Sequence, residues 1–114
     1  MKYKKSDSLK KNSDFLTVYR KGNSKANRQL IMYVMPNHLD FNRLGISCSK
    51  KVGNSVVRHH LTRLIRESYR LHEDMFNSGL DIVVVVRNEA KDLEFKDIEK
   101  SFLHLSNLHK NLLI

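Results

Sequence analysis

Three segments of the chain have the apolar patterns of β-strands. Residues 29–36 are mostly apolar up to a proline that ends the stretch, and residues 81–86 are a continuous apolar run rich in β-branched valine. That run predicts a central strand buried on both faces. Residues 43–49 alternate, with apolar side chains on one face. The opposite face carries residues small enough to line a groove: Gly45, Ser47 and Ser49. The polar residues 22–28 are expected to form a loop.

Helical spacing of apolar residues predicts three helices. A short helix is expected over about 13–21, capped by Ser13 and ended by Gly22. An amphipathic helix follows a Gly-Asn-Ser turn within residues 50–70. The last helix is expected from about Phe95 to the C-terminus, with apolar residues at helical spacing: Ile98, Phe102, Leu105 and Leu112. The final residues 106–114 either pack on the domain or mark a contact.

The order helix-strand-strand-helix-strand-helix predicts an α/β (α+β) sandwich around a small mixed sheet of about four strands. The strands at 43–49 and 81–86 flank a helix of crossover length, so they are expected to be parallel. General statistics favour a right-handed crossover. The length predicts one domain over residues 1–114, in which residues 1–11 are a basic, mobile arm with Leu9 tucked in.

Positive charge is concentrated in two separate segments of the chain. The net charge is +9, and residues 1–28 hold nine basic and two acidic groups. Residues 50–70 hold six basic groups and one acidic group, whereas residues 71–114 hold five basic and eight acidic groups. Such clustering favours a nucleic-acid partner over general surface solubility. The two basic segments would act together only if the fold brings them close.

Several classes of protein and of site are not expected. No apolar run approaches the roughly 20 residues that span a bilayer, and the basic N-terminus lacks the apolar stretch of a secretory signal. We therefore expect a cytoplasmic protein. The one cysteine, Cys48, excludes an internal disulfide and is expected in the core. The carboxylates and the six histidines lack the grouping of a Mg²⁺, acid–base or zinc site.

The amphipathic helix within residues 50–70 is the clearest candidate for binding RNA. At about 100° per residue, its apolar residues fall on one side: Val57, Leu61, Leu64 and Ser68. An arc of roughly 140° on the opposite side holds its polar and basic residues: Arg58, His59, Thr62, Arg63, Arg66 and Arg70. Asn54 or Ser55 can cap the helix, and its free N–H groups could equally meet a phosphate. Lys50 and Lys51 slightly favour the phosphate.

Three aromatic residues suggest a second surface for RNA. Phe15, Tyr19 and Tyr33 could be stacking platforms for unpaired bases. The pattern alone fits equally well with Phe15 and Tyr19 as core residues of the first helix.

Four segments, taken in their order and spacing, carry a family resemblance. They are LKKNSDFLTVYRKGNSKANRQL at 9–30, RLGISCSKK at 43–51, SKKVGNSVVRHHLTRLIRESYR at 49–70 and GLDIVVVVR at 79–87. Over most of residues 9–105 the chain resembles the protein subunit of bacterial ribonuclease P. The resemblance implies a small protein bound, as one copy, to a large catalytic RNA. That RNA removes the 5′ leader from precursor tRNA by hydrolysis and itself holds the Mg²⁺ ions.

The resemblance also implies which residues meet each RNA. The leader would lie in a cleft between the first helix and the sheet, lined by Phe15, Tyr19, Lys21, Ser24, Tyr33, Ser47 and Ser49. The catalytic RNA would contact the basic helix and the residues before it: Lys50, Lys51, Asn54, Arg58, His59, His60, Thr62, Arg63, Arg66 and Arg70. No metal and no catalytic residue is expected on the protein. The implied crossover is left-handed, and this expectation replaces the general one.

The basic helix departs from the motif of that family. The usual Arg-Asn-Arg, followed two positions later by Lys-Arg, is matched at Arg58 and Arg63, but His59, His60 and Thr62 stand at the other positions. Two permanent charges are therefore missing. We expect a lower affinity for RNA, rising below about pH 6.5 as histidines gain a proton.

The sequence thus predicts the protein subunit of ribonuclease P, which binds leader and catalytic RNA and raises substrate affinity. Two rivals are a non-catalytic ribosomal or tRNA-binding module and a self-sufficient, metal-dependent nuclease. Cleavage of precursor tRNA by the protein alone would favour the nuclease. If the protein does not stimulate cleavage by its cognate RNA, the non-catalytic RNA-binding module would be favoured.

Overall fold

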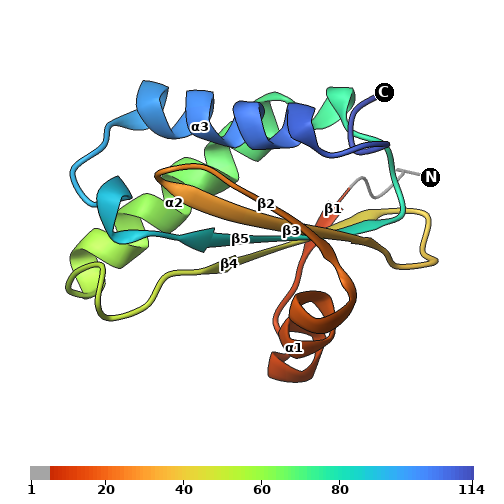
Figure 1. Cartoon of the computed structure of the whole chain (residues 1–114), viewed down its shortest axis with the longest axis horizontal. Coiled ribbons are helices and arrows are strands. Elements are labelled where there is room, and N and C mark those ends of the chain that lie inside the picture. The colour runs from red at the N-terminus through yellow and green to blue at the C-terminus, as the bar shows by residue number, and fades with distance from the viewer. Residues whose placement is uncertain (1–5) are drawn as a thin grey trace.

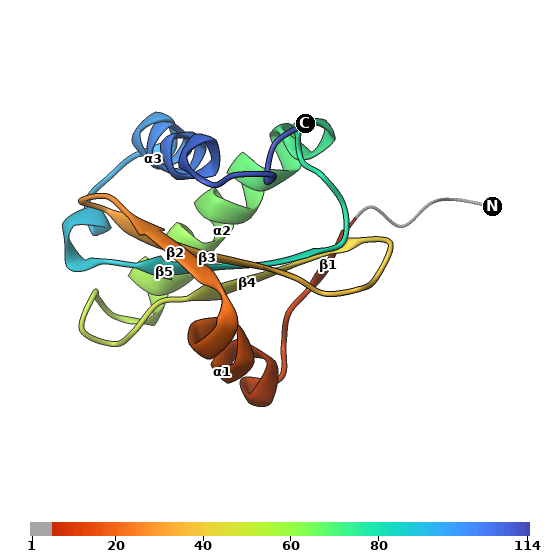
Figure 2. The same cartoon turned by 45° about the vertical axis from the view of Figure 1, so that its right-hand side comes forward.

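A five-stranded mixed sheet organises residues 6–114, the part of the chain that the computed structural model describes. The strands are β1 (Ser6–Ser8), β2 (Asn23–Ala26), β3 (Leu30–Pro36), β4 (Asn42–Ser47) and β5 (Leu80–Val86). The helices are α1 (Asn12–Lys21), α2 (Ser55–Leu71) and α3 (Phe95–Leu108), with short 3₁₀ turns η1 (Glu73–Met75) and η2 (Asn88–Ala90). Helices α2 and α3 cover one face of the sheet, and α1 lies against the other (Figures 1 and 2). The predicted α+β class is confirmed.

The centre of the sheet agrees with the prediction. Its strand order is β1-β4-β5-β3-β2. Strands β4 and β5 are parallel neighbours, with Leu44 opposite Ile82, and α2 lies between them in the chain. Strand β5 is buried on both faces, because Ile82, Val83 and Val84 are all 0% exposed. The left-handed sense of the β4-α2-β5 connection stays a prediction.

Two short edge strands were not predicted. The predicted loop at 22–28 contains β2, which pairs antiparallel with β3. All its residues are exposed, so no apolar alternation marks it. The predicted mobile arm is wrong over residues 6–11, because Ser6–Ser8 form β1, parallel to β4, and the Lys11 carbonyl accepts hydrogen bonds from the first turn of α1. Leu9 is buried, as expected, while residues 1–5 of the expected arm lie outside the described residues.

The ends of α1 and α2 differ in how they are capped. Helix α1 begins at Asn12 after Lys11, without a side-chain cap, so the predicted capping role of Ser13 is wrong. The expected end at Gly22 is confirmed, and the Gly22 N–H donates to the Val18 carbonyl at 2.8 Å. Helix α2 has the predicted side-chain cap, since Asn54 Oδ1 accepts from the backbone N–H of Val57 at 3.0 Å.

Helix α3 ends at Leu108, six residues before the C-terminus. The prediction of a helix to the last residue is therefore wrong. Asn111 adopts a positive φ of 66° and reverses the chain, after which Leu112 packs in the core at 0% exposure. Leu113 forms a β-bridge with Phe76. Of the two alternatives for the C-terminal residues, packing on the domain is the one observed.

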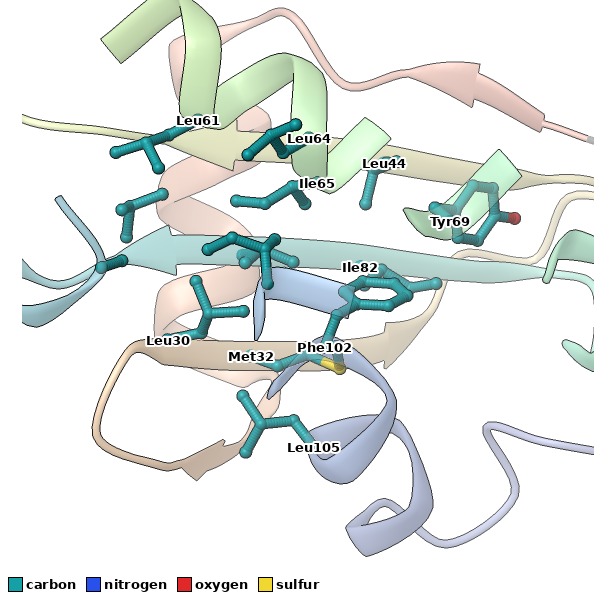
Figure 3. Packing of buried hydrophobic residues seen from close by; sticks show 14 of the residues in the cluster. Leu30, Met32, Leu44, Leu61, Leu64, Ile65, Tyr69, Ile82, Phe102 and Leu105 are labelled. Carbon is teal, nitrogen blue, oxygen red and sulfur yellow. The ribbon is translucent and has the colours of Figure 1, made fainter. Parts of the chain in front are cut away.

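The main core lies between the sheet and the helices α2 and α3. Leu61 and Ile65 of α2 and Phe102 of α3 are fully buried against the strands (Figure 3). Each such side chain contributes roughly 1.5–3 kcal/mol by leaving water. A smaller cluster on the other face joins Leu9, Val18 and Val83 to α1. None of the helices in residues 6–114 has both the length and the apolar character needed to cross a bilayer.

Candidate nucleic-acid interface

Helix α2 divides into an apolar and a cationic side, as predicted. Leu61, Leu64 and Ser68 are buried against the core, and Val57 is half-buried. The opposite side holds the exposed residues His59, Arg63, Arg66 and Arg70 and the half-buried residues Arg58 and Thr62. We call this side, with Lys50 and Lys51, the α2 surface.

The start of α2 adds positive potential to this surface. Lys50 and Lys51 are exposed in the turn before the helix, and Asn54 caps it. The first turn of α2 contains no acidic residue. Free N–H groups and the positive end of the helix dipole therefore lie next to two lysines, an arrangement that suits phosphate.

The side chains of the α2 surface differ in how far they are already engaged. Arg70 forms an ion pair with Glu67, with Nη2 and Oε1 2.5 Å apart. This hydrogen bond lowers the pKa of Glu67 and raises that of Arg70. Arg66 Nη1 donates to Ser8 Oγ at 3.0 Å. Arg58 Nε is buried and has no hydrogen-bond partner within residues 6–114.

Cys48 lies near Arg58 and packs against the main core. Burial raises the pKa of the Cys48 thiol, and the positive charge of Arg58 only partly opposes that effect. Cys48 packs against the core as expected, but it is half-buried and not fully buried. Its raised pKa fits a thiol of low reactivity.

His60 is not brought together with the other predicted residues of α2. It is exposed and lines a pocket of about 400 Å³ beside Asp92 and Glu94. The helical projection, which put His60 outside the basic arc, therefore agrees with the structure. His59 lies on the cationic side, so the two adjacent histidines face different surroundings.

Phe15, Tyr19 and Tyr33 form an aromatic row between α1 and β3. The ring centroids of Phe15 and Tyr19 are 6.3 Å apart, and those of Tyr19 and Tyr33 are 5.1 Å apart in an edge-on arrangement. All three rings are half-buried, and they pack on the cluster of Leu9, Val18 and Val83. They are therefore part of a core and of a surface at once, so the two interpretations of the sequence are compatible.

The remaining predicted leader residues flank this aromatic row. Ser24 of β2 is exposed and lies opposite Tyr33, and Lys21 is exposed at the end of α1. Ser47 is half-buried opposite Val85, and Ser49 is exposed after β4. We call the aromatic row together with Lys21, Ser24, Ser47 and Ser49 the α1 surface.

Two apolar residues of this face were missed by the sequence analysis. Ile31 pairs with Val85 across β3 and β5, and Val85 in turn pairs with Ser47. Both are half-buried beyond the aromatic row. The available signal was strand alternation, since Ile31 lies two residues before Tyr33 and therefore on the same face.

The sequence analysis expected Gly45 to line a groove, and this expectation is wrong. It is buried under the ring of Phe15, and a Cβ at this position would lie 2.7 Å from Phe15 Cζ. The absence of a side chain at Gly45 therefore lets α1 pack closely on the sheet.

A partly buried ion pair lies beside the first turn of α1. Arg43 Nε and Nη2 donate to the Asp81 carboxylate at 2.8 and 2.6 Å. Arg43 Nη1 also reaches Asp14 Oδ2 of α1 at 3.5 Å. The hydrogen bond to Asp81 is the largest cause of a raised pKa at Arg43.

The rest of the described chain shows how the two basic segments meet. Strand β1 is attached to α2 at both ends, since Ser6 Oγ bonds the Tyr69 hydroxyl at 2.7 Å and Ser8 Oγ accepts from Arg66. Ser6 Oγ also donates to the Glu73 carboxylate of η1. Strand β1 then leads through Lys10 and Lys11 into α1. The fold thus joins the α2 surface to the N-terminal basic segment along one edge of the sheet.

Residues 6–114 contain no group of three or more His, Cys, Asp or Glu that could hold a metal ion.

Residues 3–110 match the family model described as Ribonuclease P. The chain belongs to the ribonuclease P protein family. The ribonuclease P protein component of Lachnoclostridium phytofermentans is 56% identical over 105 residues, which cover 92% of this chain and 90% of that relative. The ribonuclease P protein component of Clostridioides difficile is 45% identical and covers 92% of this chain and 93% of the relative.

Solved ribonuclease P proteins have the same fold. The protein from Staphylococcus aureus superposes with a TM-score of 0.86 at 42% identity, covering 92% of this chain and 96% of that chain. The protein from Thermotoga maritima gives a TM-score of 0.83 at 28% identity, covering 90% and 97%. The chain is therefore a ribonuclease P protein component, part of the endoribonuclease that matures the 5′ ends of tRNA. Its partner is the ribonuclease P RNA, and a ribosomal or tRNA-binding module is not favoured.

Proposed function

We propose that the protein binds two RNAs through two surfaces and leaves the chemistry to its RNA partner. The α2 surface contacts the ribonuclease P RNA, and the α1 surface contacts the single-stranded 5′ leader of precursor tRNA. One protein, itself monomeric, binds one RNA in the cytoplasm. The contact between Arg66 and Ser8 carries this proposal, because it joins the basic helix to the segment that leads into α1.

The α2 surface suits the backbone of a folded RNA. Arg63 is exposed and has no ion-pair partner within residues 6–114, so its guanidinium is available for a phosphate. Arg58 Nε is a buried donor without a partner in that range, and a phosphate oxygen would offset the cost of its desolvation. Lys50, Lys51 and the start of α2 extend the same positive surface.

The α1 surface suits single-stranded RNA. The half-buried rings of Phe15, Tyr19 and Tyr33 are held in fixed positions by the cluster beneath them, so little conformational entropy is lost when a base stacks on them. Base-to-aromatic stacking contributes about 1–3 kcal/mol per base and tolerates different sequences. Such tolerance fits a leader whose sequence varies between tRNAs.

We propose that the metal ions of this reaction are held mainly by the RNA. The described residues include no cluster of His, Cys, Asp and Glu that could hold a cation, and Asp81 and Glu67 are engaged with arginines. The protein raises substrate affinity by binding the leader while it is bound to the RNA.

Two sets of variants, tested against two ligands, examine this division. Arg63→Glu should weaken binding of the ribonuclease P RNA and leave binding of a short leader oligoribonucleotide nearly unchanged. Tyr19→Leu keeps an apolar side chain and removes the ring. It should therefore weaken binding of the leader oligoribonucleotide by roughly tenfold and leave binding of the ribonuclease P RNA unchanged. Lys96→Glu, exposed on α3, is the matched control. Equal losses for both ligands in both variants would contradict the two-surface arrangement.

A further inference from the structure

A pocket at the β2 edge of the sheet lies outside the α2 surface and next to the α1 surface. It has a volume of about 540 Å³ and is enclosed by the start of β2, the end of β3 and the turn after α3. This volume falls in the range of roughly 300–1,000 Å³ typical of small-ligand sites. Its walls are partly apolar, with Pro36 and Leu108 among them.

The lining of this pocket is cationic and contains no acidic residue. Lys25 and Lys110, which are far apart in the sequence, both line it and are exposed. Each of the three other pockets described within residues 6–114 includes a carboxylate, for example Glu73, Glu94 or Asp97. The pocket is therefore suited to an anionic ligand, although residues 71–114 as a whole are acidic.

His109 gives the pocket a polar group of defined orientation. It is 6% exposed, and its Nε2 lies 3.0 Å from the Met32 carbonyl. A carbonyl can only accept, so Nε2 carries the proton, and Nδ1 of the neutral ring is an acceptor. Nδ1 has no hydrogen-bond partner within residues 6–114, and the His109 side chain lines the pocket. Burial lowers the pKa of His109 and favours this neutral form.

We infer that the pocket binds one nucleotide of single-stranded RNA. The phosphate lies between Lys25 and Lys110, and the base lies against the apolar wall near Pro36 and Leu108. His109 Nδ1 accepts a hydrogen bond from an amino or imino N–H of the base, or from the ribose 2′-hydroxyl.

The position of the pocket explains how the RNA reaches it. Ser24 lines the pocket and also lies opposite Tyr33, so the α1 surface and the pocket meet at the edge strand β2. A leader that stacks on the aromatic row would pass over this edge and place a nucleotide in the pocket. The inference therefore rests on the proposed binding of the leader at the α1 surface.

The test compares short and long oligoribonucleotides on the purified full chain. A tetranucleotide covers the α1 surface alone, and a twelve-nucleotide single strand also reaches the pocket. The variants are Lys110→Glu and Lys25→Ala at the pocket, Lys96→Glu as a charge-matched control outside it, and Tyr19→Leu at the α1 surface. The ring resonances of His109 in NMR spectra report directly on the pocket, and adenosine monophosphate serves as the free-nucleotide probe.

The expected effects depend on the length of the oligoribonucleotide. The longer strand should bind more tightly and shift the His109 resonances, and Lys110→Glu should weaken it by about five- to tenfold while changing the tetranucleotide by less than about twofold. Lys96→Glu should change neither ligand by more than about twofold.

Two results would overturn the inference. The first is an unchanged His109 spectrum at saturation with the longer strand, together with equal effects of Lys110→Glu and Lys96→Glu. The second is a shift with adenosine monophosphate as strong as with the long strand, which would make the pocket a free-nucleotide site. A failure of the leader proposal is detected separately. In that case Tyr19→Leu would not change the affinity for either oligoribonucleotide, whether or not the His109 resonances shift.

Discussion

The ring of Phe15 lies directly against the backbone of Gly45. A Cβ on residue 45 would lie 2.7 Å from Cζ and 2.9 Å from Cε1 of that ring, well inside van der Waals contact. The same ring is the first of the aromatic row proposed to meet the leader. One contact between α1 and β4 therefore both stabilises the fold and sets the position of the α1 surface.

Gly45→Ala should destabilise the protein and move α1. Overpacking of this kind costs about 1–3 kcal/mol, and the free energy of unfolding can be measured by urea denaturation. In the background of Phe15→Leu, which removes the ring atoms that clash, the cost of Gly45→Ala should shrink. Purely additive effects in this double-mutant cycle would contradict the proposed contact between the Phe15 ring and Gly45.

Asp81→Asn should destabilise the protein by weakening a partly buried ion pair with Arg43. The Asp81 side chain is 5% exposed and accepts two hydrogen bonds from Arg43, whose own side chain is 27% exposed. Loss of one partner from a fully buried pair costs about 3 kcal/mol, so a smaller cost is expected for this partly exposed pair. Denaturation of the variant measures this cost. Glu67→Gln breaks the exposed pair with Arg70 and is the control, for which little change is expected. Equal stability of the two variants would contradict a structural role for Asp81.

Arg63→Glu and Arg66→Glu should weaken binding of the ribonuclease P RNA and flatten its dependence on salt. Each lost phosphate contact reduces the slope of log affinity against log salt by about one. Filter binding over a series of KCl concentrations gives the slope. A loss of affinity with an unchanged slope would show that these arginines act through the fold and do not contact phosphate.

The affinity for RNA should rise as the pH falls from 7.5 to 5.5. His59 is exposed on the α2 surface, and histidine is the side chain whose charge most often changes near neutral pH. His59→Asn should remove most of the rise, whereas His60→Asn, on the side facing Asp92, should keep it. An affinity independent of pH in the unchanged protein would refute this expectation.

Periodicity was sufficient to predict the elements whose two sides differ in burial. Helix α2 follows its projected faces, and β5 is buried on both sides because its run of valines has no polar face. Edge strand β2 was missed, because all of its residues are exposed and nothing in their pattern distinguishes a strand from a loop. Strand β1 was missed for a related reason: its three residues are all polar, and two of them, Ser6 and Ser8, bond distant residues of α2.

Contacts between residues far apart in the sequence account for the other differences. Nothing near Gly45 indicates that Phe15 covers it, so a groove-lining role was a natural but wrong expectation. The predicted helix over the last residues failed because Asn111 turns the chain and brings Leu112 into the core by another route. The residues of the two RNA surfaces were found from charge, helical projection and family resemblance, and their contacts with RNA stay predictions.

The most direct test of the central claim is cleavage of precursor tRNA by the protein, by its cognate ribonuclease P RNA and by both together. Each reaction is run with substrates carrying leaders of one and of eight nucleotides. The protein alone should cleave neither substrate. Added to the RNA, it should lower the KM of the long-leader substrate, and Tyr19→Leu should abolish most of that gain. Cleavage by the protein alone, or equal stimulation for both leaders, would contradict a protein that acts by binding leader and RNA.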